Sequence, residues 1–264
     1  MVLEMATFIF NIPFGDNAKL RHVINEVKKD VKLQTLWRCA NVMAIDRMGY
    51  TDHGPTHVKI VANVALKMLR MLVEKKVVPS IVKDYGMKSE DAEVVVVLGS
   101  IFHDLGMTVI RDDHEMFGAL LASEFIEKFL QGIYSEEEKT IILSEVLHEI
   151  VSHEEPRKPL TLEAGIVRIA DALDMEKGRA RIPFESGKVD IHSVSALSIE
   201  KVSIQEGDVK PVTVRIVMSN PAGIFQIDQL LKPRIEDSGL KSYIHVVAEI
   251  TGEKKNRILD KFEI

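Results

Sequence analysis

Histidine and aspartate side chains lie within or beside apolar segments at three places in the sequence. His57 opens the segment His-Val-Lys-Ile-Val-Ala, the pair His103 and Asp104 follows the apolar run 94–102, and Asp171 lies between Ala170 and Ala172. A charged carboxylate among apolar residues is costly unless it is paired, hydrogen-bonded or metal-bound. A shared cation would supply such a partner, and a salt bridge from Asp171 to Arg168 is the alternative.

A second carboxylate, Asp174, follows Asp171 by three residues and would share its helix face. It could contribute to the same cation. It could instead form salt bridges with the basic residues that follow it, which are Lys177, Arg179 and Arg181.

Helices must position these groups, because the apolar residues around them recur at helical spacing. The pattern predicts helices over 17–44, 56–76, 89–105, 113–131, 135–153 and 159–177. The third has Ser89 as its expected N-cap and Glu90 and Asp91 in its first turn, and it is nearly all apolar after these residues. It is therefore expected to be the buried central helix, with Gly106 as its C-cap. Ser135 and Glu138 form a capping-box pattern at the start of the fifth helix.

The spacing changes after Pro183. Alternating apolar residues predict strands over 194–204, 211–218 and 242–250, with a helix over 224–237 that Pro233 kinks or ends early. Residues 251–264 form a short polar segment for which a helix is one option. The fold class is therefore mainly α: an all-helical domain over 1–183, followed by a small α+β domain of ββαβ order over 190–264, with ligand binding or homodimerisation as its candidate roles.

Composition bounds the class of protein. The 264 residues are 46% hydrophobic and 28% charged, which is typical of a globular protein. No apolar run reaches the roughly 18 residues that span a bilayer, and residues 1–14 lack the features of a signal peptide. The single cysteine, Cys39, fits a reducing cytoplasm, and the net charge of −6 disfavours a dedicated nucleic-acid surface. We expect a cytoplasmic protein with no membrane or nucleic-acid partner.

The order His57, then His103-Asp104, then Asp171 resembles the H…HD…D pattern of the HD-domain metal-dependent phosphohydrolase superfamily. The surroundings are similar as well. The matching segments are Asp-His-Gly-Pro-Thr-His-Val at 52–58, Phe-His-Asp-Leu-Gly at 102–106 and Ile-Ala-Asp-Ala-Leu-Asp at 169–174. The resemblance covers about 50–180 and leaves 190–264 outside.

The resemblance implies an all-helical HD domain in which His57, His103, Asp104 and Asp171 bind a divalent metal. Mn, Fe, Co, Ni, Zn and Mg all suit a mixed nitrogen and oxygen site. The metal would activate a water molecule and polarise a phosphoryl oxygen, and Asp104 could orient or deprotonate that water.

Three further histidines, His114, His148 and His153, are candidates for a second metal ion, with Asp104 as the bridge between two ions. His148 and His153 are about 140° apart on a helix, which makes them poor partners on one metal unless the helix ends between them. The alternative is one ion, with these histidines contacting phosphate or acting as an acid. The sequence lacks the Gly-Tyr-Pro tripeptide of the two-metal HD-GYP pattern. The resemblance therefore does not support hydrolysis of a cyclic dinucleotide, the reaction of that group.

Basic side chains near the motifs could neutralise a phosphate group. Arg111 is the candidate for a catalytic role, and His53, Lys59 and Arg168 are candidates for substrate binding. The favoured function is metal-dependent hydrolysis of a small phosphorylated substrate, for which a nucleotide is one candidate. The alternatives are a nucleotide-binding regulatory protein and a di-iron HD oxygenase.

Overall fold

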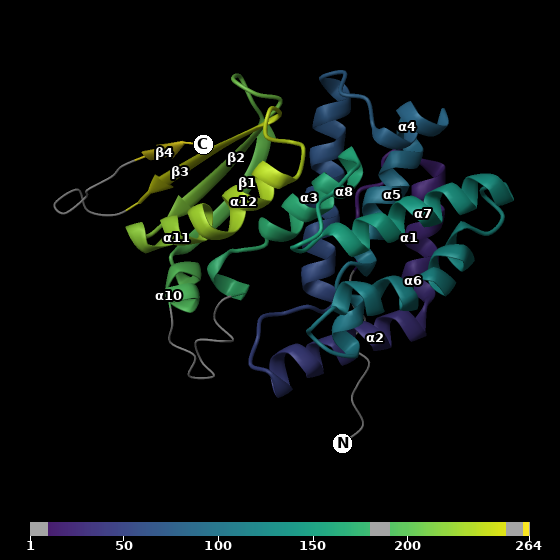
Figure 1. The fold of residues 1–264 in the computed structure, drawn as a ribbon, viewed down its shortest axis with the longest axis horizontal. Helices are drawn as coiled ribbons and strands as arrows, with labels where there is room; N and C mark the ends of the chain where they lie inside the picture. The colour runs from purple at the N-terminus through teal and green to yellow at the C-terminus, as the bar shows by residue number, and fades with distance from the viewer. Residues whose placement is uncertain (1–9, 180–190, 252–260, 264) are drawn as a thin grey trace.

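The computed structural model describes residues 10–179, 191–251 and 261–263. Helices form the first part of the chain, as the sequence predicts (Figure 1). They are α1 (Ala18–Lys29), α2 (Val31–Asn41), α3 (Pro55–Glu74), α4 (Ser80–Tyr85), α5 (Ser89–Phe102), α6 (His114–Leu130), α7 (Glu136–Ser152) and α8 (Leu162–Ala172). A π-helical turn, Val42–Arg47, extends α2, and a 3₁₀ turn, Leu105–Thr108, follows α5.

Helix α5 is the centre of this helical part. Its residues from Asp91 to Phe102 are buried except Glu93, and α1, α3, α7 and α8 pack around it. The apolar run therefore has the central place that its lack of a polar face predicts. Because His103 and Asp104 directly follow Phe102, the end of this helix places both side chains inside the protein.

Local hydrogen bonds explain where several helices begin. Asn17 accepts from the backbone N–H of Leu20 at 2.9 Å, and the capping box of Ser135 and Glu138 is confirmed. The predicted single helix over 17–44 is wrong, because Asp30 is extended and its carboxylate caps a new helix through the N–H of Leu33.

The predicted caps of α5 are also wrong. Ser89 is the first helical residue, and the N-cap position is Lys88. Gly106 lies in the 3₁₀ turn after Asp104, since the helix already ends at Phe102. Helix α4 was missed because its six residues are too short for a periodic pattern.

A four-stranded sheet forms the C-terminal part, in the order β1-β2-β3-β4. The strands are β1 (Ile199–Glu206), β2 (Val212–Met218), β3 (Ile244–Ile250) and β4 (Lys261–Glu263). Strands β2 and β3 are parallel, and both outer pairs are antiparallel. The first strand starts five residues later than predicted, because Ile191–Leu197 is a helix, α10. The predicted segment 251–264 contains strand β4, and its residues 252–260 lie outside the described ranges.

A helical crossover connects the parallel strands. It consists of α11 (Ile224–Gln226), a π-helical turn (Ile227–Leu231) and α12 (Lys232–Asp237). Proline lacks the N–H that continues an α-helical ladder, so the irregular turn just before Pro233 agrees with the predicted kink.

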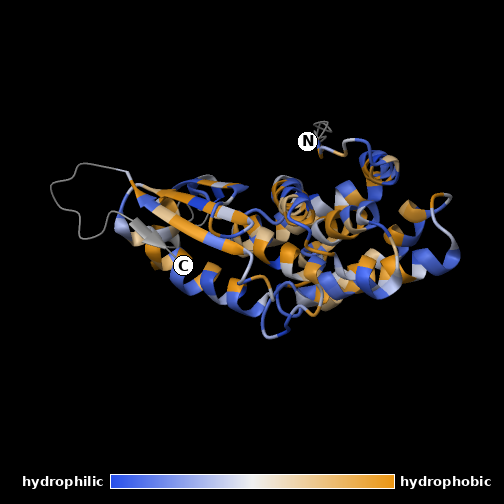
Figure 2. Ribbon diagram, turned by 90° about the horizontal axis from the view of Figure 1, so that it is seen from above, coloured by the Kyte–Doolittle hydropathy of each residue, from blue (hydrophilic) through white to orange (hydrophobic). Residues whose placement is uncertain are grey.

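The helical part and the sheet part share one hydrophobic core. Helix α12 packs against α8, and α3 contacts β1 and β2. Figure 2 shows apolar residues along the strands and on the helices beside them. The predicted domain boundary falls within 180–190, outside the described residues. None of the described helices combines the length and apolar character that crossing a bilayer requires.

Gly106 permits a close approach that positions the start of α6. A Cβ atom at this residue would lie 1.9 Å from the carbonyl oxygen of His114 and 2.6 Å from the backbone nitrogen of Gly118. We predict that Gly106→Ala lowers the free energy of unfolding by about 1–3 kcal/mol, because the backbones must separate. Urea denaturation measures the change.

The control is Gly178→Ala, since a Cβ atom there has no neighbour within 4 Å. Its free energy of unfolding should change by less than about 1 kcal/mol. Equal stabilities of the two variants would contradict the packing argument.

Candidate metal centre

Four side chains from three parts of the helical region converge at the end of α5. The Nε2 atom of His57 lies 3.0 Å from Nε2 of His103, 3.2 Å from Oδ2 of Asp104 and 3.3 Å from Oδ1 of Asp171. Helix α3 supplies His57 in its first turn, the end of α5 supplies the His-Asp pair, and the last turn of α8 supplies Asp171. We call His57, His103, Asp104 and Asp171 the first donor set.

Two more histidines face the other oxygen of the same aspartate. Oδ1 of Asp104 lies 3.2 Å from Nε2 of His114 and 3.7 Å from Nε2 of His153. The two Nε2 atoms are 3.2 Å apart. We call Asp104, His114 and His153 the second donor set. Asp104 therefore lies between two pairs of imidazoles and offers one oxygen to each.

The hydrogen bonds of the four imidazoles orient their Nε2 atoms inward. Each Nδ1 lies 2.6–2.9 Å from an oxygen that can accept its proton. These oxygens belong to Asp174 for His57, Ser100 for His103, Arg111 for His114 and Ile150 for His153. A ring that donates through Nδ1 keeps the Nε2 lone pair for a metal, and this arrangement is typical of metal-ligating histidines.

Helix ends supply two of these acceptors. His103 follows α5 and His153 follows α7, and each ring bonds the carbonyl three residues before it. The last carbonyls of a helix have no partner within the helix, so a histidine placed there satisfies one of them. The same bond fixes the ring and turns Nε2 towards Asp104.

The electrostatics of the cluster favour a cation. Burial and nearby Arg179 lower the pKa of His57, but hydrogen bonds to three aspartates outweigh them and raise it to about 10. Burial also lowers the pKa of His103, and Asp104 and Asp171 raise it to about 9. Burial raises the pKa of Asp104, but the surrounding histidines hold it well below its ordinary value. Two imidazoles that face each other at 3.0 Å, with carboxylates around them, match the donor set of a divalent metal.

Asp174 positions a donor. Its Oδ2 lies 2.6 Å from Nδ1 of His57 and 3.4 Å from Nη1 of Arg179. Asp174 therefore pairs with one of the basic residues that follow it, as one sequence-based alternative predicts. It also contacts the cluster, through His57. It lies behind the imidazole and not among the converging Nε2 and carboxylate atoms.

His148 joins neither donor set, in contrast to the sequence-based expectation. Its Nε2 accepts from the backbone N–H of Leu160 at 2.9 Å, and that bond occupies the lone pair. Helix α7 ends at Ser152, after His148 and before His153, but the helical phase still keeps the two side chains apart.

The candidates for phosphate binding separate into two groups. Arg111 lies at the cluster, where it binds the carboxylate of Glu154 through both Nη atoms at 2.7 and 2.8 Å. His53 is also near, with its ring centroid 5.9 Å from that of His57, and burial lowers its pKa to about 4.

Arg168 is buried and bonds the backbone, which argues against its predicted role in substrate binding. It is 1% exposed, and its Nη1 donates to the backbone carbonyls of Ser152 and Arg157. Lys59 lies two residues after His57 on α3, about 200° around the helix, so helical geometry directs it away from the donor sets.

A third group of possible ligands, His114, Glu115 and Glu154, is explained by ion pairs. Glu115 binds Arg157, and Glu154 binds Arg111. The Nδ1 atom that His114 would contribute already lies 2.9 Å from the carbonyl oxygen of Arg111 and 2.9 Å from Nη1 of the same residue. These pairings leave the first and second donor sets as the candidates for metal binding among the described residues.

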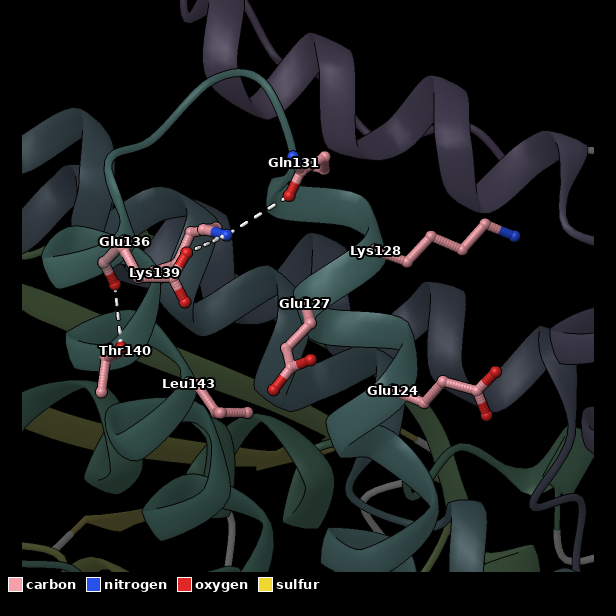
Figure 3. Close-up of a pocket in the computed structure, with 8 residues that line it drawn as sticks. All are labelled: Glu124, Glu127, Lys128, Gln131, Glu136, Lys139, Thr140 and Leu143. Carbon is pink, nitrogen blue, oxygen red and sulfur yellow. Dashed lines mark hydrogen bonds and ion pairs between the residues drawn. The ribbon is translucent and has the colours of Figure 1, made fainter.

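A pocket of about 420 Å³ lies elsewhere, between the end of α6 and the start of α7 (Figure 3). Charged residues of both signs line it, and Lys139 bonds Gln131 and Glu136 across it. It holds no histidine. Glu124 follows His114 by ten residues, about 15 Å along the helix, so this pocket is separate from the donor sets.

Sequence reasoning missed Glu154 and Arg234 as neighbours of the cluster. Nη1 of Arg234, on α12, binds Oδ2 of Asp171, and its Nη2 lies 3.9 Å from Oε1 of Glu154. Glu154 follows His153 directly and could have been noted for that reason. No local pattern connects Arg234 to residues more than sixty positions earlier.

The comparisons with known proteins agree with this geometry. The family model described as "HD domain" matches residues 55–176, which include all members of both donor sets. "Uncharacterized protein MJ1020" of Methanocaldococcus jannaschii is 47% identical over 232 residues, which cover 88% of this chain and 90% of that protein. The chain belongs to the HD-domain superfamily.

Proposed function

We propose that this protein is a metal-dependent phosphohydrolase whose centre holds two divalent cations, one at each donor set. The observation that carries the proposal is the orientation of four imidazoles. Each keeps its Nδ1 on an oxygen acceptor and directs its Nε2 towards one oxygen of Asp104. Membership of the HD-domain superfamily supports the same chemistry, because its members are generally metal-dependent hydrolases.

The metals, when bound, would activate water and stabilise the charge of a phosphoryl group. Asp104 would orient the attacking water or take its proton, since its carboxylate lies at the centre of both sets. Arg111 would neutralise phosphate charge from the side of His114. Asp174 would keep His57 in the tautomer that presents Nε2.

The substrate class follows from this chemistry. Two cations and an arginine select a phosphate ester, and the proposed substrate is a small phosphorylated molecule such as a nucleotide. The divalent ion is one of Mn, Fe, Co, Ni, Zn or Mg, all of which accept nitrogen and oxygen ligands.

A substrate screen tests the proposal. Chelator-treated protein is reloaded with each divalent metal and assayed with phosphomonoesters, phosphodiesters and nucleotides. We expect hydrolysis of at least one class with at least one metal, and none without metal. An iron-loaded protein that absorbs visible light and hydrolyses no ester would instead favour the oxygenase alternative.

Within the same screen, Asp104→Ala should abolish hydrolysis and sharply reduce the metal content, because it removes the carboxylate that both donor sets share. The control is Asp112→Asn, an exposed acidic residue in the loop before α6, which should behave as the wild type. Wild-type metal occupancy in Asp104→Ala would refute the assigned centre.

The number of metals is tested separately. Elemental analysis should find about two ions per chain in the wild type. His114→Ala and His153→Ala should each lower this number towards one and reduce the rate, because they remove ligands of the second set only. His148→Ala is the matched control on α7 and should keep two ions, since its ring bonds Leu160. Unchanged stoichiometry in both test variants would overturn the assignment of a second ion to this donor set.

Asp174→Ala tests the support of the first donor set. Loss of the acceptor for His57 should weaken binding of the first ion about ten- to a hundredfold, while saturating metal still loads two ions. Metal titration of chelator-treated protein measures the affinity. An affinity equal to that of the wild type would mean that the hydrogen bond does not support the centre.

A further inference from the structure

Arg234 is a contribution of the C-terminal part to the candidate centre. It lies on α12, outside the residues 55–176 that match the HD domain. Its Nη1 binds Oδ2 of Asp171, the oxygen that faces away from the imidazoles, while Oδ1 faces His57. The side chain is 20% exposed, so part of it is accessible to solvent.

The packing of α12 fixes this position. A Cβ atom at Gly165 of α8 would lie 2.4 Å from the carbonyl oxygen of Ser238, so only glycine permits the end of α12 to lie this close. Ile235, next to Arg234, is 3% exposed, and Asp237 binds Lys158 at 2.7 Å. The residues that follow Arg234 thus hold this end of α12 beside α8.

Arg111 is the second arginine beside the donor sets. It contacts His114 of the second donor set, whereas Arg234 contacts Asp171 of the first. Glu154 lies between the two guanidinium groups, and its Oε1 is 2.7 Å from Nη2 of Arg111 and 3.9 Å from Nη2 of Arg234. The guanidinium groups of Arg111 and Arg234 therefore lie on either side of the Glu154 carboxylate, beside both donor sets.

The two arginines and Glu154 are more exposed than the four imidazoles of the donor sets. The side chains of Arg111, Glu154 and Arg234 are 33%, 26% and 20% exposed, whereas the four imidazoles are 2% exposed or less. The two guanidinium groups are therefore more accessible to an oxyanion from solvent than the imidazoles are. The carboxylate of Glu154 already lies beside both guanidinium groups, so a phosphate bound there would share them with Glu154.

We propose that Arg234 binds the phosphoryl group of the substrate, together with Arg111, so that the C-terminal part supplies half of a phosphate clamp. Glu154 holds the two guanidinium groups apart and yields part of their hydrogen bonding to phosphate oxygens. The guanidinium fork suits this role, because one edge stays on Asp171 while other N–H groups face the phosphate. This inference rests on the proposed phosphohydrolase function and extends it to a residue outside the HD domain.

A different role for Arg234 would be to neutralise Asp171 alone. That role predicts a change in metal affinity but none in phosphate affinity once metal is saturating. The two roles are therefore separable by a binding measurement that needs no turnover.

The test is equilibrium dialysis of radiolabelled inorganic phosphate against the full chain at saturating Mn²⁺. Arg234→Gln should bind phosphate at least about tenfold more weakly than the wild type, as expected for a lost hydrogen bond to a charged group. Lys232→Gln is the control on the same helix, since Lys232 binds Asp228 and is 38% exposed. It should bind phosphate as the wild type does.

Arg234→Lys gives a second measurement and keeps the charge if Arg234→Gln does not fold. We expect severalfold weaker phosphate binding, because an ammonium cannot make the two-pronged contact. Phosphate affinity within twofold of the wild type in the folded variants would overturn the proposal, whether or not metal binding changes. Phosphate binding through Arg234 in a protein that hydrolyses no ester would refute the hydrolase function but not the clamp.

Discussion

The two oxygens of Asp104 are the constraint around which the candidate centre is built. One faces His57 and His103, and the other faces His114 and His153. A carboxylate that is 5% exposed and surrounded by imidazoles is stable only where positive charge compensates it. Helices α3, α5, α6, α7 and α8 each place at least one group within reach of this residue or of its partners. Much of the helical architecture thus positions groups around this one aspartate.

Helix ends, more than helix faces, provide that support. His103 and His153 follow the last residues of α5 and α7, and His114 begins α6. Backbone groups at helix ends lack partners, and these rings use the free carbonyls to fix their own orientation. The close contact of Gly106 with the first turn of α6 brings the third ring to the same place. The positions of the donor atoms therefore depend on backbone packing as well as on side-chain identity.

The sequence predicted the parts of the site that local patterns encode. The motifs around His57, His103-Asp104 and Asp171 and the helices that carry them follow from apolar spacing, and helical phase already made His148 a poor partner of His153. The sequence suggested phosphate binding by Arg168, whereas the buried side chain bonds backbone carbonyls. The two kinds of arginine cannot be distinguished from the sequence alone. Helix α10 was mistaken for strand since short apolar runs fit both. Arg234 depends on how α12 docks on α8, which no local pattern contains.

The ion pair between Arg234 and Asp171 also makes the two parts of the chain thermodynamically coupled. It forms only while α12 is docked on α8, so anything that strengthens the pair also strengthens the docking. Linkage between two binding sites is reciprocal. A ligand that binds the sheet part and shifts α12 would change ligand affinity at the candidate centre, and a ligand of that centre would change the affinity of the sheet part by the same factor. Ligand binding at the sheet part and ligand binding at the helical centre can in this way be coupled through the side chain of Arg234.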